Sequence, residues 1–367
     1  MKLIHIVGNR PQFIKLAPLL RALSGNKDIK NIVIHSGQHY DFNMAQIFLD
    51  EFQLTSPDYN LEVGSGTHGE QTGQILVKLD RILMEERPDY VLVYGDTNTT
   101  LAGSLAAYKL HIPIAHVESG LREGVWRPEE INRKLSDHCS DFLFCPTKTA
   151  VECAQNEGIP PEKVFLTGDI TYDAFLHSIK KIKNGNQKKD DEADYILLTL
   201  HRAETVDFKN ILSEIVAALL EMNERILFPA HPRTVKYLKK FELFKLVEDS
   251  EKIELTAAVG YYEFLNKLLS AKLVITDSGG VIKEAFYAKK PCVTLDYTTE
   301  YKEIHESGFN LWAGKEKKSI LDAVKKMKKV DASLISPEQV FGDGTAANKM
   351  VDIILTDFQS KQEKTSC

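Results

Sequence analysis

Short apolar runs alternate with longer segments of helical period along the whole chain, and this alternation constrains the fold most. Segment 208–220 shows the helical period, with apolar residues at 208, 211, 212, 215, 216, 219 and 220. Continuous apolar strands separated by helices are typical of parallel sheets covered on both faces. We therefore predict an α/β protein of two doubly wound, Rossmann-like halves, joined by the polar segment 180–194. The expected strands are 3–7, 31–35, 90–94, 113–117, 142–145 and 164–166, then 195–200, 225–229, 253–257, 272–276, 291–295 and 310–312.

The stretch TDSGGVIKEAF at 276–286 joins the end of an expected strand, a glycine-rich turn and the start of a helix. Gly279 and Gly280 lack side chains that would block close approach, so backbone N–H groups and the helix dipole are able to face phosphate oxygens. Glu284 follows about one helical turn later, within reach of a sugar hydroxyl beside a diphosphate. The turn also fits a structural role, in which Ser278 caps the helix and Glu284 is a solvated acid.

Composition excludes several classes of protein. The chain has 367 residues and a formal net charge of −6, which predicts about two domains and argues against a nucleic-acid partner. The apolar run 3–7 is far shorter than the core of a signal peptide, and no run approaches a membrane span. Five cysteines without a Cys-x-x-Cys motif indicate neither a zinc site nor a disulfide framework. We therefore expect a cytoplasmic protein with no membrane partner.

Polar residues gather where the expected strands end, which is where open α/β sheets bind ligands. A single His or Asp at a strand end is more often a cap or a loop hydrogen bond, but seven such groups in one topological position favour a ligand site. His116 and Glu118, two residues apart, are expected on one face of their strand. The groups are Arg10 with Lys15, Gln38 with His39, Asp96, His116 with Glu118, His201 with Arg202, His231, and the Ser-Gly-Gly turn.

The two halves differ in the kind of charge they supply. The first half carries the carboxylates Asp96, Glu118 and Glu129, and the second carries the histidines, arginines and Ser-Gly-Gly turn. This division suggests that the second half anchors a diphosphate and the first transfers protons. Glu129 also fits a structural role, because acids are favoured at a helix start and Glu129 could pair with Arg133 four residues on.

Further patterns argue against a cofactor. GSGTHG at 64–69 matches G-x-G-x-x-G, but it follows a poor strand and is not at the first strand-to-helix turn of its sheet. The histidines lack the paired spacing of metal motifs, and the chain has no P-loop. We expect neither a redox cofactor nor a metal.

A set of motifs runs in order along nearly the whole chain: GNRPQFIK (8–15), SGQH (36–39), YGDTNTTLAGSLAA (94–107), HVESGLR (116–122), PEEINR (128–133), HRAE (201–204), HPRT (231–234), TDSGGVIKEA (276–285), TTE (298–300) and GDGTAA (342–347). In this the chain resembles the non-hydrolysing UDP-N-acetylglucosamine 2-epimerase family. The resemblance implies a glycosyltransferase-B-like fold with its active site in the interdomain cleft. Domain 1–172, completed by a helix at 345–360, would carry the catalytic carboxylates, and domain 173–344 would bind UDP. A homodimer is also implied.

The family's reaction meets a chemical need. Carbon 2 of an N-acetylhexosamine is not next to a carbonyl, so simple removal of its proton is difficult. In the family, UDP leaves carbon 1 as a proton leaves carbon 2, giving 2-acetamidoglucal, and UDP adds back after reprotonation on the other face. The resemblance implies Asp96, Glu118 and Glu129 as acid/base groups and His201 as the group that assists the leaving UDP. The implied UDP-sugar ligands are Arg10, Lys15, Gln38, His39, Arg202, His231, Ser278, Gly279, Gly280 and Glu284.

The sequence leaves both the substrate and the class of activity open. Phrases such as GSGTHGEQTG and SGGVIKEAF look more like the branch that epimerises UDP-2,3-diacetamido-2,3-dideoxyglucuronate for O-antigen synthesis, and Arg122 or Arg127 could read its carbon-6 carboxylate. However, TEY at 299–301 departs from the Thr-Glu-Trp usual in that branch. A glycosyltransferase of the same architecture is the main rival from another class. A hydrolysing epimerase and a non-catalytic nucleotide-sugar sensor are further rivals.

Overall fold

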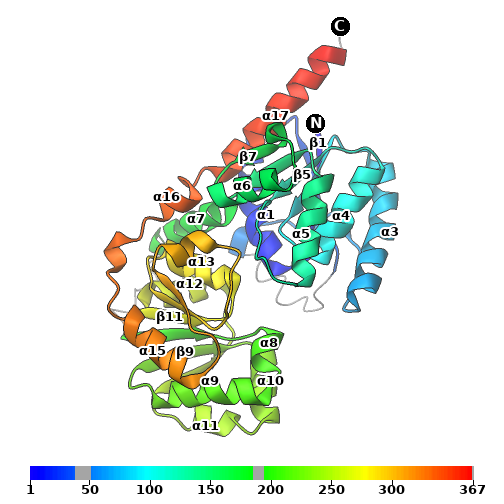
Figure 1. Cartoon of the computed structure of the whole chain (residues 1–367). Helices are drawn as coiled ribbons and strands as arrows, with labels where there is room; N and C mark the ends of the chain where they lie inside the picture. Colours follow the sequence, from blue (N-terminus) through cyan, green and yellow to red (C-terminus); the bar gives the residue numbers. More distant parts are fainter. Residues whose placement is uncertain (38–50, 185–193, 366–367) are drawn as a thin grey trace. The chain divides into compact units, whose positions relative to one another are not determined.

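The computed structural model describes residues 1–37, 51–184 and 194–365 (Figure 1). The chain forms two compact units. Unit 1 comprises Met1–Leu176 and Glu338–Cys367, and unit 2 comprises His177–Pro337. Each unit is built on one parallel β-sheet, as expected where helices alternate with apolar strands.

The sheet of unit 1 has the strand order β3-β2-β1-β4-β5-β6-β7. Its strands are β1 (Lys2–Val7), β2 (Lys30–His35), β3 (Tyr59–Asn60), β4 (Tyr90–Tyr94), β5 (Ile114–Val117), β6 (Phe142–Cys145) and β7 (Val164–Leu166). The helices are α1 (Arg10–Leu23), α3 (His68–Glu86), α4 (Asn98–Lys109), α5 (Pro128–Cys139), α6 (Lys148–Asn156) and α17 (Ala346–Thr365). Two more helices cross the boundary between the units: α7 (Ile170–Asn184) and α16 (Pro337–Phe341). The winding reverses between β1 and β4, so their carboxyl ends flank the switch point where such sheets bind ligands.

Alternate residues of the unit 1 strands face two different cores. Leu3 and Val7 of β1 pack with apolar residues of α1 and α17. Ile4 and Ile6 pack with apolar residues of α3 and α4. Both faces of the sheet are therefore covered, which explains why its strands are apolar at nearly every position.

The sheet of unit 2 has the order β10-β9-β8-β11-β12-β13 and is also parallel. Its strands are β8 (Tyr195–Thr199), β9 (Arg225–Ala230), β10 (Ile253–Ala257), β11 (Leu273–Thr276), β12 (Cys292–Thr294) and β13 (Asn310–Trp312). The helices are α8 (Ala203–Val206), α9 (Lys209–Glu221), α10 (Pro232–Lys240), α11 (Phe244–Glu248), α12 (Tyr261–Ser270), α13 (Gly279–Tyr287), α14 (Lys302–Glu306) and α15 (Lys317–Met327). This is the Rossmann strand order, with β8 and β11 at the switch point.

The predicted fold class is confirmed. Each expected strand is present and agrees with its predicted limits to within one residue at each end. β3 was not predicted, because this two-residue edge strand is partly exposed and carries little apolar signal. The inclusion of Phe208 in the helical stripe was wrong, because this residue precedes α9 and is 54% exposed. Among the described helices, none is long and apolar enough to cross a membrane.

Candidate active site

A buried glutamine links the loop after β1 to the loop after β4. Asn9 caps α1, and the side-chain oxygen of Gln12 accepts hydrogen bonds from the N–H groups of Gly8 at 2.6 Å and Asn9 at 3.3 Å. The amide nitrogen of Gln12 donates to the carbonyl oxygen of Tyr94 at 2.6 Å and to the hydroxyl of Thr97 at 3.0 Å. These bonds fix the first turn of α1 against the loop that leads to α4.

Lys15 and Glu118 form a buried ion pair beside Gly95. Lys15 lies on α1 and is 7% exposed, and Glu118 follows β5 and is 8% exposed. The Nζ of Lys15 contacts the Oε2 of Glu118. A Cβ at Gly95 would lie 2.9 Å from that Nζ and 3.4 Å from that Oε2, and Gly95 has a φ of +63°. Glycine is therefore favoured here by both space and backbone conformation.

Glu118 has a left-handed backbone, with a φ of +66°. It lies beyond the last residue of β5, whereas His116 lies within the strand. Strand alternation therefore does not relate the two side chains, and the expectation that they share one face for that reason was wrong. The turn directs Glu118 toward Lys15, while His116 is wholly buried.

Asp96 begins the loop between β4 and α4 and contacts α5. Its Oδ2 accepts a hydrogen bond from Arg133 at 2.6 Å, and its carbonyl oxygen accepts one from Asn132 at 2.9 Å. The side chain of Asp96 remains 30% exposed, so solvent or a ligand has access to it. Arg133 also pairs with Glu130 at 3.3 Å. Glu129 is half-buried in the first turn of α5.

The predicted residues of unit 1 fall into four groups. Lys15 of α1 and Glu118 after β5 meet beside Gly95, the residue before Asp96. Glu129 is in the first turn of α5. Arg10 is the first residue of α1 and is half-buried. Gln38 and His39 lie outside the described residues.

In unit 2, the buried carboxylate of Asp277 joins the loops after β8 and β11. It accepts hydrogen bonds from the N–H groups of His201 at 3.1 Å and Arg202 at 2.9 Å, and the Nδ1 of His201 lies 3.4 Å from its Oδ1. Burial alone would raise the pKa of Asp277, but His201 and the Arg202 backbone hold that pKa below its usual value. The His201 side chain is 43% exposed, so its ring is accessible to a ligand.

The Ser-Gly-Gly turn begins α13 at Gly279. Ser278 is the N-cap residue, but its side chain makes no capping hydrogen bond, so it does not cap the helix through its hydroxyl. A Cβ at Gly279 would lie 2.9 Å from an oxygen of Glu300 and 3.7 Å from the Nη2 of Arg202. The first N–H groups of α13 and a guanidinium therefore lie close together, as phosphate binding requires. Glu284 is half-buried on the same helix.

Two histidines stand near each other at the ends of β8 and β9. The ring centroids of His201 and His231 are 5.9 Å apart. The Nδ1 of His231 accepts a hydrogen bond from the N–H of Arg233 at 3.1 Å, so the proton of its neutral ring is on Nε2. In the described parts of the chain, no three His, Cys, Asp or Glu side chains gather as metal ligands would.

Three acidic residues of unit 2 were missed as parts of the site. Asp277 and Glu300 lie inside the motifs TDSGG and TTE, so the motifs gave a signal for both. Asp296 lies in none of the motifs, yet it pairs with Arg202 at 2.8 Å. Only the fold brings Asp296 to that arginine, because 94 residues separate the two.

Arg122 and Arg127 are both engaged by carboxylates of unit 1. Arg122 is buried and donates to both oxygens of Glu157, at 2.9 and 2.6 Å, and its Nη2 lies 2.8 Å from Asp137. Arg127 pairs with Glu123 at 2.8 Å. Arg122 is therefore unsuited to the suggested role of reading a substrate carboxylate.

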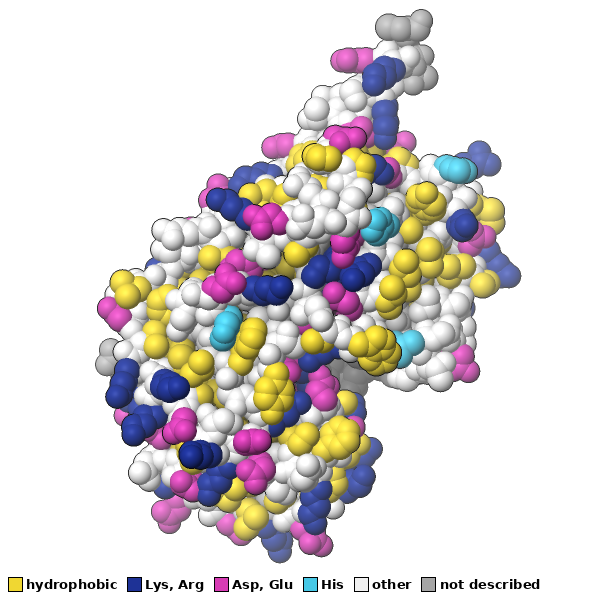
Figure 2. All heavy atoms as spheres, in the orientation of Figure 1, with side chains coloured by type: hydrophobic (Ala, Val, Ile, Leu, Met, Phe, Trp, Pro, Cys, Tyr) yellow, Lys and Arg dark blue, Asp and Glu magenta, His cyan; other side chains and the backbone are white. Residues whose placement is uncertain are grey.

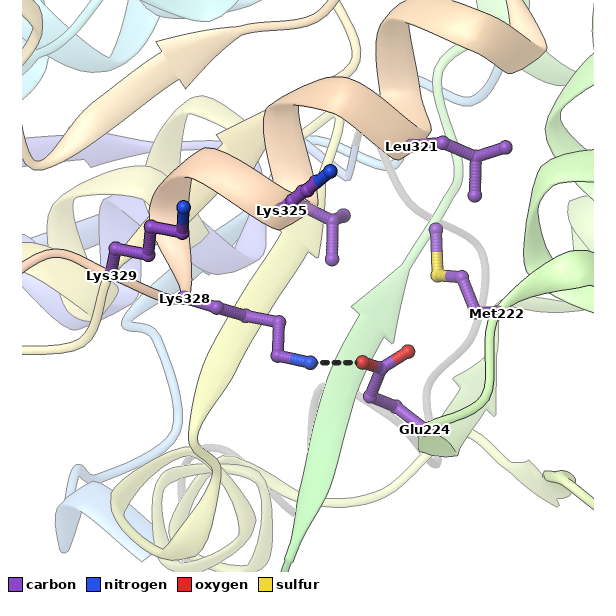
Figure 3. A pocket seen from close by; sticks show the side chains of 7 residues that line it. Met222, Glu224, Leu321, Lys325, Lys328 and Lys329 are labelled. Atoms are coloured by element: carbon purple, nitrogen blue, oxygen red, sulfur yellow. Dashed lines mark hydrogen bonds and ion pairs between the residues drawn. The ribbon is translucent and has the colours of Figure 1, made fainter.

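A surface pocket of about 400 Å³ lies elsewhere in unit 2 (Figure 3). Leu321 and Lys325 of α15, with Lys328 just after that helix, line one side, and Met222 and Glu224, between α9 and β9, line the other. Lys328 pairs with Glu224 across it. None of the predicted site residues lines this pocket, so it plays no part in the candidate site.

Two Rossmann-like units, each with one parallel sheet, are the architecture of the glycosyltransferase-B-like fold class. The family model described as UDP-N-acetylglucosamine 2-epimerase matches residues 21–355, and the chain belongs to this family.

Relatives match over almost the full length. The UDP-N-acetylglucosamine 2-epimerase of Methanocaldococcus jannaschii is 46% identical over 367 residues, covering 96% of this chain and 99% of that protein. The UDP-2,3-diacetamido-2,3-dideoxy-D-glucuronate 2-epimerase of Pseudomonas aeruginosa is 40% identical over 362 residues, with coverage of 96% and 99%. The crystal structure of the Methanocaldococcus jannaschii enzyme with UDP-GlcNAc and UDP has a TM-score of 0.90 at 44% identity, covering 97% of this chain and 100% of that one.

Proposed function

We propose that the protein interconverts UDP-N-acetylglucosamine and UDP-N-acetylmannosamine by epimerisation at carbon 2. The observation that carries the proposal is the Lys15–Glu118 ion pair beside Gly95, the residue before Asp96, in a chain of this family. One carboxylate would suffice as the base of a glycosyl transfer. Epimerisation by elimination and return needs groups that remove a proton and deliver one to the other face.

Unit 2 holds the diphosphate in this proposal. The N–H groups at the start of α13 and the guanidinium of Arg202 bind phosphate oxygens, because both donate hydrogen bonds to anions. Asp277 holds the ring of His201 in place. His201 assists the departure of UDP, which leaves carbon 1 with the electrons of the broken C–O bond. His231 and Glu284 complete the binding, the latter at the ribose hydroxyls.

Unit 1 transfers the protons. As UDP leaves, a carboxylate of the group Asp96, Glu118 and Glu129 takes the proton from carbon 2, and the double bond of 2-acetamidoglucal forms between carbons 1 and 2. Another group of this set returns a proton to the opposite face, and a UDP oxygen then attacks carbon 1. The Lys15 ammonium balances the charge of Glu118 when that carboxylate is ionised. Arg10, Gln38 and His39 bind substrate in this scheme.

UDP-N-acetylglucosamine is favoured over the diacetamido-uronate substrate. A carbon-6 carboxylate needs a cation, and the two arginines suggested for it are already paired, Arg122 with Glu157 and Arg127 with Glu123. Comparing turnover of the two nucleotide sugars tests this preference. Faster turnover of the diacetamido-uronate would overturn it.

Incubation with UDP-N-acetylglucosamine alone tests the activity. Proton NMR should show a mixture of the two UDP-sugars at equilibrium, with no acceptor required. Release of free N-acetylmannosamine would indicate a hydrolysing epimerase instead. An unchanged substrate that is consumed only when an acceptor is added would indicate a glycosyltransferase.

We also propose a homodimer through the outer face of α3, α4 and α5. Large apolar side chains are exposed on this face: Val77, Met84, Tyr108, Ile131 and Leu135 are between 41% and 55% exposed. α4 packs against both α3 and α5, so these residues belong to one continuous surface, and hydrophobic side chains gather over it in Figure 2. A second copy covers the patch in this proposal, because contiguous apolar surface of this kind marks interfaces.

We place the protein in the cytoplasm, where its product enters surface polysaccharide synthesis such as that of O-antigen. Four cysteines among the described residues are free thiols. Burial raises the pKa of Cys145 and of Cys292 to about 12, so these two thiols are unreactive. Free cysteines agree with a reducing compartment.

A further inference from the structure

His116 is a wholly buried histidine that the proposed reaction does not use. It lies in β5 and is 0% exposed. Its Nδ1 is 2.7 Å from the Oδ1 of Asp137, and its Nε2 is 2.6 Å from the carbonyl oxygen of Gly95. A carboxylate and a carbonyl both accept hydrogen bonds, so each ring nitrogen of His116 faces an acceptor.

Asp137 makes further contacts with its other carboxylate oxygen. Its Oδ2 accepts a hydrogen bond from the N–H of Gly120 at 3.1 Å and lies 2.8 Å from the Nη2 of Arg122. Burial alone would raise the pKa of Asp137, but His116 and Arg122 hold that pKa below its usual value. Asp137 is therefore buried and ionised, and each of its two carboxylate oxygens contacts a hydrogen-bond donor.

Two hydrogen bonds join the His116–Asp137 pair to the loops that carry the candidate acid/base groups. Gly95 is the residue before Asp96, and its carbonyl oxygen is held by His116. Gly120 lies two residues after Glu118, and its N–H is held by Asp137. Both loops contain left-handed residues, with φ values of +63° at Gly95, +66° at Glu118 and +76° at Gly120. The two glycines adopt this conformation readily, but Glu118 keeps it only where its surroundings fix it.

We propose that His116 and Asp137 are positioning residues that hold Asp96 and Glu118 in a fixed relative geometry for proton transfer. This proposal rests on the proposed function, which assigns the chemistry to those two carboxylates. A buried charged pair adds little net stability compared with well-packed apolar side chains. Its value lies in tying two loops, 23 residues apart at Gly95 and Glu118, to one rigid strand and helix.

Two variants of His116 separate the hydrogen bond to Gly95 from the bond to Asp137. The amide nitrogen of Asn occupies roughly the place of Nδ1, so His116→Asn keeps a donor to Asp137 and loses the one to Gly95. The amide nitrogen of Gln occupies roughly the place of Nε2, so His116→Gln keeps the donor to Gly95. The matched control is Ser136→Ala, because Ser136 is buried beside Asp137 and its hydroxyl has no hydrogen-bond partner within the described part of the chain.

The readouts are kcat and KM for UDP-N-acetylglucosamine, the Kd for UDP and the Tm. We expect His116→Asn to lower kcat about 100-fold, as expected for a displaced catalytic group, with KM and the UDP Kd within about twofold of wild type. The kcat of His116→Gln should be at least about tenfold higher than that of His116→Asn, and Ser136→Ala should have the kcat of wild type. Asp137→Asn weakens the hold on Gly120 and on the His116 ring. It should therefore also lower kcat, and it serves if His116→Asn does not fold.

Several results would overturn the inference. They are a kcat near wild type in His116→Asn, no recovery in His116→Gln, or a loss in kcat that only follows a fall in Tm. A wild-type protein without epimerase activity would contradict the proposed function itself, so the two failures are distinguishable.

Discussion

Glu118 is held in a left-handed conformation that a residue with a side chain adopts only at a cost, with a φ of +66°. The ion pair with Lys15 and the hydrogen bond that anchors Gly120 offset this cost. The same turn places the Glu118 carboxylate beside Gly95, which is the residue before Asp96 in the chain. At the scale of single residues, the site is therefore organised by backbone turns that would be unfavourable alone.

Asp96→Asn should remove proton transfer while leaving the fold and UDP binding intact. The amide oxygen is still able to accept the hydrogen bond from Arg133, but the amide cannot take a proton. We expect kcat to fall by about 10²- to 10⁴-fold, and calorimetry should give an unchanged UDP affinity. Asp352→Asn, at an exposed position on α17, is the control. Activity near wild type in Asp96→Asn would remove Asp96 from the mechanism.

Gly279→Val should lose UDP binding first. A Cβ at this position already lies 2.9 Å from Glu300, and the two methyl groups of valine would cover the N–H groups at the start of α13. We expect UDP to bind at least about tenfold more weakly, or about 1.4 kcal/mol, by calorimetry. Gly73→Val on α3 is the matched control, because a Cβ there meets nothing within 4 Å. Equal UDP affinity in both variants would contradict a diphosphate site at this turn.

The sequence was enough to predict that Lys15 and Glu118 lie at one edge of their sheet, because parallel strands bring their carboxyl ends together there. It was not enough to predict how they pair. Lys15 and Glu118 are 103 residues apart, and Arg202 and Asp296 are 94 apart. Such contacts depend on loop conformations that no local pattern specifies. The conformation of Glu118 is one of these, and strand alternation did not foresee it.

At the scale of elements, α17 returns to unit 1 and packs against α1. Asp173 of α7 contacts the first turn of α17, where its carboxylate accepts a hydrogen bond from the N–H of Ala347 at 2.8 Å. Burial raises the pKa of Asp173 from 3.8 to about 6, with the charges of Asp169 and Asp343 adding to the shift. In the folded chain the carboxyl is therefore protonated below about pH 6 and ionised above it.

Asp173→Asn should remove a pH dependence of stability. Because the folded pKa is raised, the stabilising contribution is complete below pH 3.8 and is lost as pH rises through about 6. A shift of this size corresponds to up to about 3 kcal/mol. The variant should match wild type near pH 4 and exceed its free energy of unfolding above pH 7, because the amide is able to keep the bond to Ala347. Urea denaturation at both pH values measures this, and parallel pH profiles would contradict it.

Elements were predicted well because buried parallel strands are apolar on both faces. Failures occurred where that signal is absent. β3 is a short, partly exposed edge strand. Phe208 is apolar and in phase with α9, but it precedes the helix and faces solvent. Periodicity alone does not mark where a helix begins.

At the scale of the whole molecule, the apolar face of α3, α4 and α5 predicts self-association. Ile131→Glu combined with Leu135→Glu places two charges on that face, where both side chains are exposed. We expect sedimentation to give twice the chain mass of 41.4 kDa for wild type and the single mass for the double variant. Leu334→Glu, at a residue of unit 2 that is 71% exposed, should remain dimeric. A monomeric wild type would contradict the homodimer.

The central claim is that the proton on carbon 2 is removed and replaced while UDP is eliminated and returned. Proton NMR of UDP-N-acetylglucosamine in deuterium oxide, without any acceptor, tests it most directly. We predict that deuterium enters carbon 2 of both UDP-sugars in the presence of the wild-type protein and not with Asp96→Asn. Conversion to UDP-N-acetylmannosamine with the original proton still on carbon 2, or no conversion at all, would contradict this mechanism.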